Sequence, residues 1–293
     1  MSPRLAVAIG STCSRPRDLS GNLAQVRGLA RQAGALGVHV LLTPEMSASG
    51  YGGYPAVLAL AEPAGDGPVF RGLADIAAES GVIVLAGFVE RNGSLRHIAH
   101  YAVRPDGRYW VQRKHRVTPS EAPLDPAVPL VPSPDEDIGQ VEPGTERFTS
   151  LEIEGVRCAM VICADWGIPH LDAALAGLGV RMVFLPTGAG GTRDQRVDNA
   201  ELETEAGRET FLRMADRDPE LGRRALACRR LGRGLATVNL AGFDGIRLYH
   251  GGSGSILSPA GDVLALVPAC PNFMRAAPRL AFAEVDFGEA PGG

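Results

Sequence analysis

The first 42 residues alternate between strand and helix patterns, and this alternation constrains the fold more than any other feature. An apolar run at 5–9 predicts a short buried strand, and a second run at 38–42 predicts another. Between them, apolar side chains recur over 23–33 at the spacing of one helix face. A strand, a crossover helix and a strand of this length form a β-α-β unit. We therefore expect an α/β fold.

The same alternation continues to the end of the chain. We expect helices at 69–79 and 171–178 and a charged, mostly helical stretch at 193–232. We expect further strands at 82–89, 97–103, 109–113, 148–153, 156–162, 182–185, 235–240, 254–257, 263–267 and 280–286. The Pro-rich residues 119–146 lack periodicity and predict a long surface loop, of a kind that is often functional. With no convincing linker, residues 1–293 are predicted to form one domain with two sheet layers and a core at about 4–287.

Composition narrows the class of protein. A hydrophobic content of 45% with 21% charged residues is ordinary for a globular chain, and a net charge of −4 gives no reason to expect nucleic acid or an anionic membrane as partner. The sequence has no apolar run near the roughly 18–20 residues that span a bilayer, and its first residues lead us to expect no signal peptide. Its five cysteines lack the spacing of a zinc site or a disulfide framework. We expect a cytoplasmic protein.

Lys114 is the only lysine, although the chain has 29 lysine and arginine residues in total. Against such a bias toward arginine, a position that stays lysine can require a compact ammonium group with a tunable pKa. The alternative is chance, because one stray lysine needs no explanation. Other features are needed to decide between the two.

Two more chemically useful side chains stand, like Lys114, at the ends of predicted strands. Glu45 follows the strand at 38–42, and Cys163 ends the strand at 156–162. Catalytic groups in α/β folds commonly lie just past such strand ends. A thiol is mostly protonated at neutral pH, an ammonium favours its thiolate, and a carboxylate can accept its proton. The three residues together predict a Glu-Lys-Cys hydrolase in which Lys114 faces the developing oxyanion.

Five segments, in this order along the chain, resemble motifs of the nitrilase or carbon–nitrogen hydrolase superfamily. They surround Glu45, Lys114 and Cys163 and continue into two late segments rich in glycine, and they comprise residues 41–51, 113–119, 161–170, 239–242 and 251–261. Each motif is modest, but five in the right order are highly specific. The resemblance covers about residues 4–287.

The resemblance implies an αββα sandwich, a four-layer α/β fold with two central mixed β-sheets. It implies Glu45 as general base, Lys114 as stabiliser of the intermediate and Cys163 as nucleophile, and it suggests Glu121 as a second glutamate beside the lysine. The expected reaction is hydrolysis of an amide bond in a small molecule through a thioester, without metal or organic cofactor. The family also implies a homodimer or larger homo-oligomer.

The chain departs from the family pattern around the cysteine. Ala164 and His170 stand where many amidase-like members have tyrosine and glutamate, and the segment lacks the Trp-Glu pair typical of nitrilases, which argues against nitriles as substrates. Tyr51, Ala164, Trp166 and His170 flank the proposed centre and are candidate substrate-binding residues.

Several alternatives stay open on sequence alone. The same centre could hydrolyse an N-carbamoyl amine or the amide of glutamine. A member of the family could also bind its ligand without turnover. The serines within 251–255 superficially resemble the loop of a serine hydrolase, but the only lysine lies more than a hundred residues away.

Overall fold

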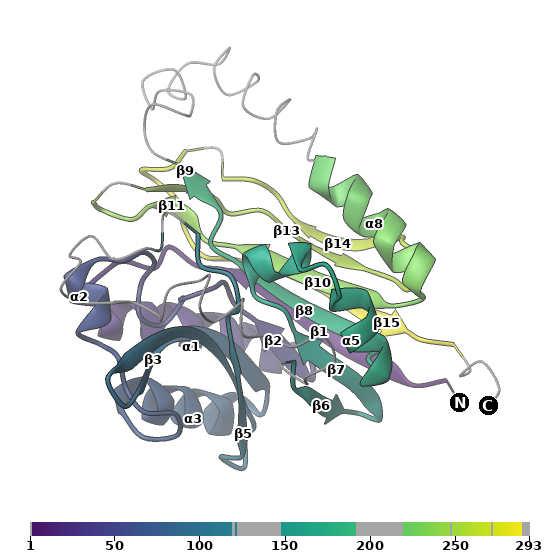
Figure 1. Cartoon of the computed structure of the whole chain (residues 1–293), viewed down its shortest axis with the longest axis horizontal. Helices are drawn as coiled ribbons and strands as arrows, with labels where there is room; N and C mark the ends of the chain where they lie inside the picture. The colour runs from purple at the N-terminus through teal and green to yellow at the C-terminus, as the bar shows by residue number, and fades with distance from the viewer. Residues whose placement is uncertain are drawn as a thin grey trace.

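Two six-stranded mixed sheets lie face to face in the computed structural model, with helices on their outer faces (Figure 1). The structure describes residues 2–118, 121, 148–191, 219–246, 248–270 and 272–288. This arrangement confirms the predicted αββα sandwich. Each sheet has three parallel strands at its centre and antiparallel strands at its edges.

The first sheet has the order β15-β1-β2-β3-β4-β5. Its strands are β1 (Arg4–Ser11), β2 (Val40–Leu42), β3 (Ile83–Asn92), β4 (Leu95–Val103), β5 (Tyr109–Arg113) and β15 (Arg279–Asp286). The parallel strands β1, β2 and β3 follow the predicted β-α-β pattern, and β4 and β5 add antiparallel hairpins. The last strand of the chain pairs with the first.

The second sheet has the order β14-β13-β10-β8-β7-β6. Its strands are β6 (Ser150–Ile153), β7 (Val156–Met160), β8 (Met182–Thr187), β10 (Gly234–Asn239), β13 (Gly254–Leu257) and β14 (Val263–Val267). A small third sheet follows the end of β8 and consists of β9 (Gly190–Gly191), β11 (Ala241–Phe243) and β12 (Tyr249–Gly251).

The helices cover the two outer faces. The first sheet is covered by α1 (Leu19–Ala35) and α3 (Pro68–Ser80), and the second by α5 (Leu171–Gly177) and α8 (Pro219–Leu231). Shorter helices are α2 (Pro55–Leu58) and the 3-10 turn η1 (Cys163–Gly167). The largest apolar cluster lies between the sheets. In the part of the chain that the structure describes, every helix is too short or too polar to cross a bilayer.

The structure corrects the sequence analysis at the cysteine. Strand β7 ends at Met160, so Cys163 does not end a strand but begins η1. The reason is its left-handed backbone, with φ of 48°, which turns the chain away from the sheet. Of the predicted helical stretch 193–232, only α8 and the residues just after it lie in the described part. The predicted loop at 119–146 lies outside it, apart from Glu121.

That residues 1–293 form a single domain stays a prediction. The cysteines predicted to be core residues are confirmed as buried. Cys158 lies between the sheets, Cys228 lies on the buried side of α8, and Cys270 is also buried.

Gly87 lets the segment that carries Glu45 lie directly against β3. Its N–H donates to Ser47 Oγ at 3.2 Å, and its carbonyl accepts from Ala48 N at 2.9 Å. A Cβ at residue 87 would lie 2.1 Å from the backbone nitrogen of Met46, far inside van der Waals contact. Because the obstacle is backbone, a rotamer change cannot relieve the clash.

We expect Gly87→Ala to destabilise the fold by about 1–3 kcal/mol, since the added methyl overpacks a closed contact and displaces the Glu45 segment. Urea unfolding measures the change. The matched control is Gly28→Ala in the exposed part of α1, where a Cβ meets nothing within 4 Å. This control should keep or slightly raise stability, because alanine favours helix over glycine. Equal stability of the two variants would contradict the close approach at residue 87.

Candidate active site

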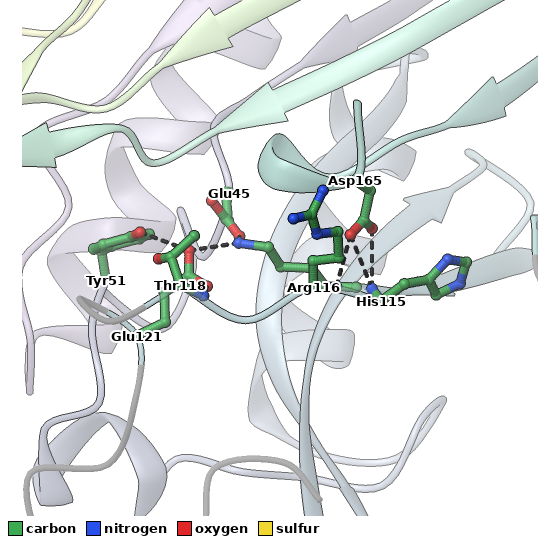
Figure 2. A network of polar contacts seen from close by, with 8 residues as sticks. Glu45, Tyr51, His115, Arg116, Thr118, Glu121 and Asp165 are labelled. Carbon is green, nitrogen blue, oxygen red and sulfur yellow. Dashed lines mark hydrogen bonds and ion pairs between the residues drawn. The ribbon is translucent and has the colours of Figure 1, made fainter. Parts of the chain in front are cut away.

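The structure brings together the four side chains that the sequence analysis gives a catalytic role. Lys114, directly after β5, donates from Nζ to Glu45 Oε1 at 2.7 Å and to Glu121 Oε1 at 2.5 Å. One carboxylate oxygen of Glu45, one of Glu121 and the sulfur of Cys163 lie within 4.8 Å of one another. Figure 2 shows the side chains of Glu45 and Glu121, which come from two separate segments and both accept from this ammonium. We refer to these four residues as the catalytic cluster.

A buried hydroxyl network fixes the segment that presents Glu45. Thr43 and Ser47 share a hydrogen bond of 2.8 Å between their hydroxyls, and Ser14 Oγ donates to the carbonyl of Ser47 at 2.6 Å. The turn passes through Met46 in the left-handed region, with φ of 53°. The small hydroxyl residues around Glu45 therefore hold its backbone in place.

Cys163 has a backbone conformation that non-glycine residues rarely adopt. Only four described non-glycine residues have positive φ, and two of them, Met46 and Cys163, adjoin or belong to the catalytic cluster. Such residues cost roughly 1–3 kcal/mol each and concentrate at functional sites. At Cys163 the turn separates the nucleophile candidate from the regular strand and directs it toward the cluster.

Burial and charge together set the ionisation of the cluster. The side chains of Glu45, Lys114 and Glu121 are fully buried. Burial and the nearby charge of Glu121 raise the pKa of Glu45 to about 8, although Lys114 opposes the shift. Burial by itself would lower the pKa of Lys114, but Glu45 and Glu121 raise it above its usual value. The lysine is therefore a permanent cation between two acids.

The sulfur of Cys163 is a thiol in the resting protein. Burial and the charge of Glu45 raise its pKa to about 12, against the influence of Lys114 and of the Gly188 backbone N–H. A protonated thiol needs a base before it can attack. Glu45 has an oxygen for that purpose, because its buried Oε2 has no hydrogen-bond partner among the described residues.

Glu121 uses both of its oxygens to hold neighbouring groups. Besides Lys114, its Oε1 accepts from the Tyr51 hydroxyl at 2.6 Å, and its Oε2 accepts from Thr118 N at 2.8 Å. The ring of Tyr51 lies against Gly188, where a Cβ would be 2.0 Å from it. Tyr51 thus lies beside the catalytic cluster and is a hydrogen-bond partner of Glu121. The position of Tyr51 in the sequence, six residues after Glu45, does not predict this contact.

Asp165 is a buried acid that the sequence analysis did not single out. Its carboxylate accepts from His115 N at 3.0 Å and from Arg116 N at 2.8 Å (Figure 2). Burial raises its pKa to about 7, although these backbone bonds and Lys114 favour the charged form. The sequence shows only that an acid stands two residues after the candidate nucleophile. It cannot distinguish a buried acid at this position from a solvated one.

The remaining predicted binding residues lie in different surroundings. Ala164 is half-buried beside Cys163 in η1. Trp166 packs against the apolar cluster between the second sheet and its helices, and His170 is exposed directly before α5. Within the described part of the chain, neither Trp166 nor His170 has a hydrogen bond to the catalytic cluster. Their roles in substrate binding stay predictions.

The cluster also bears on the metal and serine alternatives. Glu45, Glu121 and Cys163 have the spacing of metal ligands, but the ammonium of Lys114 already contacts both carboxylates at short distance and balances their charge. The ammonium of Lys114 forms ion pairs with Glu45 and Glu121, whereas Ser255 is buried in β13. A serine-lysine pair between these two residues therefore finds no support.

The chain is similar to several known proteins. A family model described as carbon-nitrogen hydrolase matches residues 5–271. A protein of Pseudomonas protegens named hydrolase in pqqF 5'region is 30% identical over 186 residues, 62% of this chain and 59% of that protein. An (R)-stereoselective amidase from Pseudomonas sp is 27% identical over 185 residues, 63% of this chain and 60% of the amidase. The chain spans about three fifths of the length of these curated relatives.

Solved structures share the fold over nearly the whole chain. An amidase from Nesterenkonia sp. has a TM-score of 0.72 at 20% identity and covers 98% of this chain and 92% of its own. A mutant of the amidase from Nesterenkonia sp. AN1, with the acetamide moiety of fluoroacetamide covalently added at its active-site cysteine, has a TM-score of 0.71 at 19% identity. It covers 98% of this chain and 92% of its own.

We expect Lys114→Gln to destabilise the protein by about 3–5 kcal/mol, because two buried carboxyl groups lose the ammonium that both of them contact. Urea unfolding at neutral pH measures this cost. The double variant Lys114→Gln/Glu121→Gln should recover part of this cost, since one buried acid is then removed together with the ammonium. A loss below about 1 kcal/mol in the single variant, the range of an exposed pair, would contradict the burial of this ion triad.

Proposed function

Because the chain belongs to the carbon–nitrogen hydrolase family, we propose that it hydrolyses the amide bond of a small molecule through a thioester on Cys163. The observation that carries the proposal is the catalytic cluster. One buried ammonium contacts two carboxylates within 4.8 Å of a sulfur, and one oxygen of Glu45 is left without a partner among the described residues. These groups supply a base, a nucleophile and a fixed positive charge.

The first half-reaction forms the thioester. The sulfur of Cys163 attacks the amide carbonyl carbon while its proton passes to Glu45 Oε2. The carbonyl oxygen becomes an oxyanion, and the ammonium of Lys114 and the backbone N–H of Ala164, the residue after the nucleophile, are the groups that stabilise it. The intermediate collapses when the carbon–nitrogen bond breaks, and the departing nitrogen takes the proton from Glu45. An amine or ammonia leaves, and the acyl group stays on sulfur.

The second half-reaction returns the enzyme to its starting state. Glu45 accepts a proton from water as the water oxygen attacks the thioester carbonyl. The new intermediate expels the sulfur, which recovers a proton from Glu45. The balance is one amide and one water consumed for one carboxylic acid and one amine or ammonia produced.

The raised pKa of Glu45 suits this double role. A carboxylate with an ordinary pKa is a weak base toward a thiol, whereas a pKa of about 8 brings donor and acceptor closer and places Glu45 near neutral operating pH. Glu121 contributes by raising that pKa and by holding Lys114 in place. Its own oxygens are occupied, so we assign it no proton transfer.

The relatives support an amide as substrate. They include an amidase named as (R)-stereoselective and an amidase whose active-site cysteine accepts the acetamide moiety of fluoroacetamide. Hydrolysis of an N-carbamoyl amine or of the glutamine amide would use the same cluster, and a binding protein would show no turnover. The cytoplasmic location, the homo-oligomeric state and the lack of nucleic-acid and membrane partners stay predictions.

The decisive experiment offers the protein primary amides, glutamine, N-carbamoyl amines and nitriles and measures ammonia release. We expect turnover of one or more simple amides, and intact-protein mass spectrometry should show an added acyl mass. In Cys163→Ala both signals should vanish, because no sulfur is present to carry the acyl group.

The matched control is Cys158→Ala, which alters a buried cysteine of β7 outside the catalytic cluster. This variant should keep its kcat, with at most a loss of stability from the smaller side chain. Full ammonia release by Cys163→Ala would exclude the thioester route. Turnover of only N-carbamoyl amines or only glutamine would select one of the alternatives, and no turnover of any compound would favour a binding protein.

The pH profile tests the role of Glu45. Since the base must be ionised before it can accept a proton, kcat/KM should be low in acid and rise as the pH passes through about 8. The measurement is kcat/KM from about pH 3.5 to 9.5 at constant ionic strength, a range that includes the usual glutamate pKa. A rising limb near the usual glutamate range of about 4–5 would contradict a raised pKa at the catalytic base.

A further inference from the structure

The buried carboxylate of Asp165 joins the turn that begins with Cys163 to the segment that follows Lys114. On the exposed side, Arg116 Nη1 also donates to the carbonyl of Gly167 at 3.2 Å. The two segments belong to different sheets, because β5 is in the first sheet and β7 in the second. We propose that Asp165 is a positioning residue that holds the Lys114 ammonium beside the sulfur of Cys163 by binding the backbone N–H groups of His115 and Arg116. The inference rests on the proposed function and assigns a role to a residue outside the catalytic cluster.

Lys114 needs support on its C-terminal side. On its N-terminal side the sheet holds it, since Lys114 N donates to Ile98 O at 2.8 Å as the ladder between β4 and β5 ends. The next two backbone N–H groups leave the sheet and donate to Asp165, His115 N at 3.0 and 3.1 Å to the two oxygens and Arg116 N at 2.8 Å to Oδ1. Lys114 is therefore fixed from both sides.

Asp165 is equally fixed to the cysteine turn. Its own N–H donates to Ile162 O at 3.0 Å, and its carbonyl accepts from Ile168 N at 3.1 Å, so its backbone forms part of η1. The side chain is buried, and Figure 2 shows it directed at the backbone of His115 and Arg116. A shift of η1 is thus transmitted through this short, buried side chain to the residue next to Lys114.

The chemistry of the site calls for a carboxylate. Both oxygens face N–H donors, and an ionised carboxylate has only acceptors, which makes such bonds short and strong. An asparagine has nearly the same shape, but its NH₂ group would face a backbone donor. Asp165→Asn therefore removes the negative charge and one of the two acceptors, with little change in volume.

We expect the substitution to act on the chemical step. Lys114 stabilises charge that develops in the transition state, so a displaced ammonium lowers kcat and leaves substrate binding nearly unchanged. A misplacement of about 1 Å can cost roughly a hundredfold in rate. A merely structural role would instead reduce the folded fraction and leave the kcat of each folded molecule intact.

The first test compares Asp165→Asn with Asp172→Asn, an acid of α5 that forms an exposed ion pair with Arg230 at 2.7 Å. With kcat referred to the folded, titrated fraction, Asp165→Asn should lose roughly 10- to 100-fold and keep KM within about twofold. Asp172→Asn should match the wild type. A wild-type kcat in Asp165→Asn, or a loss explained by the folded fraction alone, overturns the proposal.

A second test does not depend on amide turnover. Lys114 favours the thiolate of Cys163, so a displaced ammonium should slow alkylation of that sulfur at fixed pH. Iodoacetamide labelling at pH 8.5, followed on the Cys163 peptide by mass spectrometry, should be at least about threefold slower in Asp165→Asn than in Asp172→Asn. Equal or faster labelling overturns the positioning role, whereas absent amide turnover by the wild type would reject only the proposed function.

Asp165→Glu serves if Asp165→Asn fails to fold, and it is informative in either case. It keeps two acceptor oxygens but places them one methylene farther from the backbone. Its kcat and its labelling rate should lie between those of Asp165→Asn and the wild type. A glutamate variant equal to the wild type in both would show that the position of the carboxylate is not critical, and would overturn the proposal.

Discussion

The sharing of one buried ammonium between two carboxylates is the constraint on which the site depends. Removing an ion from water costs several kcal/mol even after relaxation, and only close partners offset that cost. Lys114 meets Glu45 and Glu121 at 2.7 and 2.5 Å, so each of the three charges is tolerable only while the others remain. The surplus acid gives the group a site for one more proton, and this proton can move between Glu45 and the sulfur of Cys163.

The fold meets this constraint by placing strand ends next to one another. Glu45 follows β2 and Lys114 follows β5 in the first sheet, while Cys163 follows β7 in the second. Because Cys163 follows a strand of the second sheet, its sulfur meets the charges of Glu45 and Lys114 only after the two sheets have packed face to face over their shared apolar cluster. Two local features then set the positions of the catalytic side chains more finely than sheet packing does. Gly87 allows the Glu45 segment to lie against β3, and the left-handed turn at Cys163 orients its side chain.

Periodicity predicted an α/β fold with two sheet layers, and strand ends together with residue chemistry predicted that Glu45, Lys114 and Cys163 act together. The αββα sandwich and the part of Glu121 were implied by the resemblance to the family. The sequence did not predict the partner of Tyr51, because a hydrogen bond to Glu121 joins residues 70 positions apart. It also did not predict that the indole of Trp166 packs toward α5 and α8. The role of Trp166 in substrate binding stays a prediction. Neighbours across a fold are set by tertiary packing, and a linear pattern does not contain them.

The contacts of Asp165 could not be predicted from the sequence either, and the physical reason is clear. A sequence gives its distance from Cys163, but the groups that it binds are backbone N–H groups, which every residue except proline carries and which leave no compositional mark. Hydrogen bonds to backbone N–H groups can fix the relative position of segments from two sheets, whatever side chains the residues that donate them carry. The catalytic side chains of this protein are therefore recognisable by their chemistry, whereas the contacts that orient them become visible only in three dimensions.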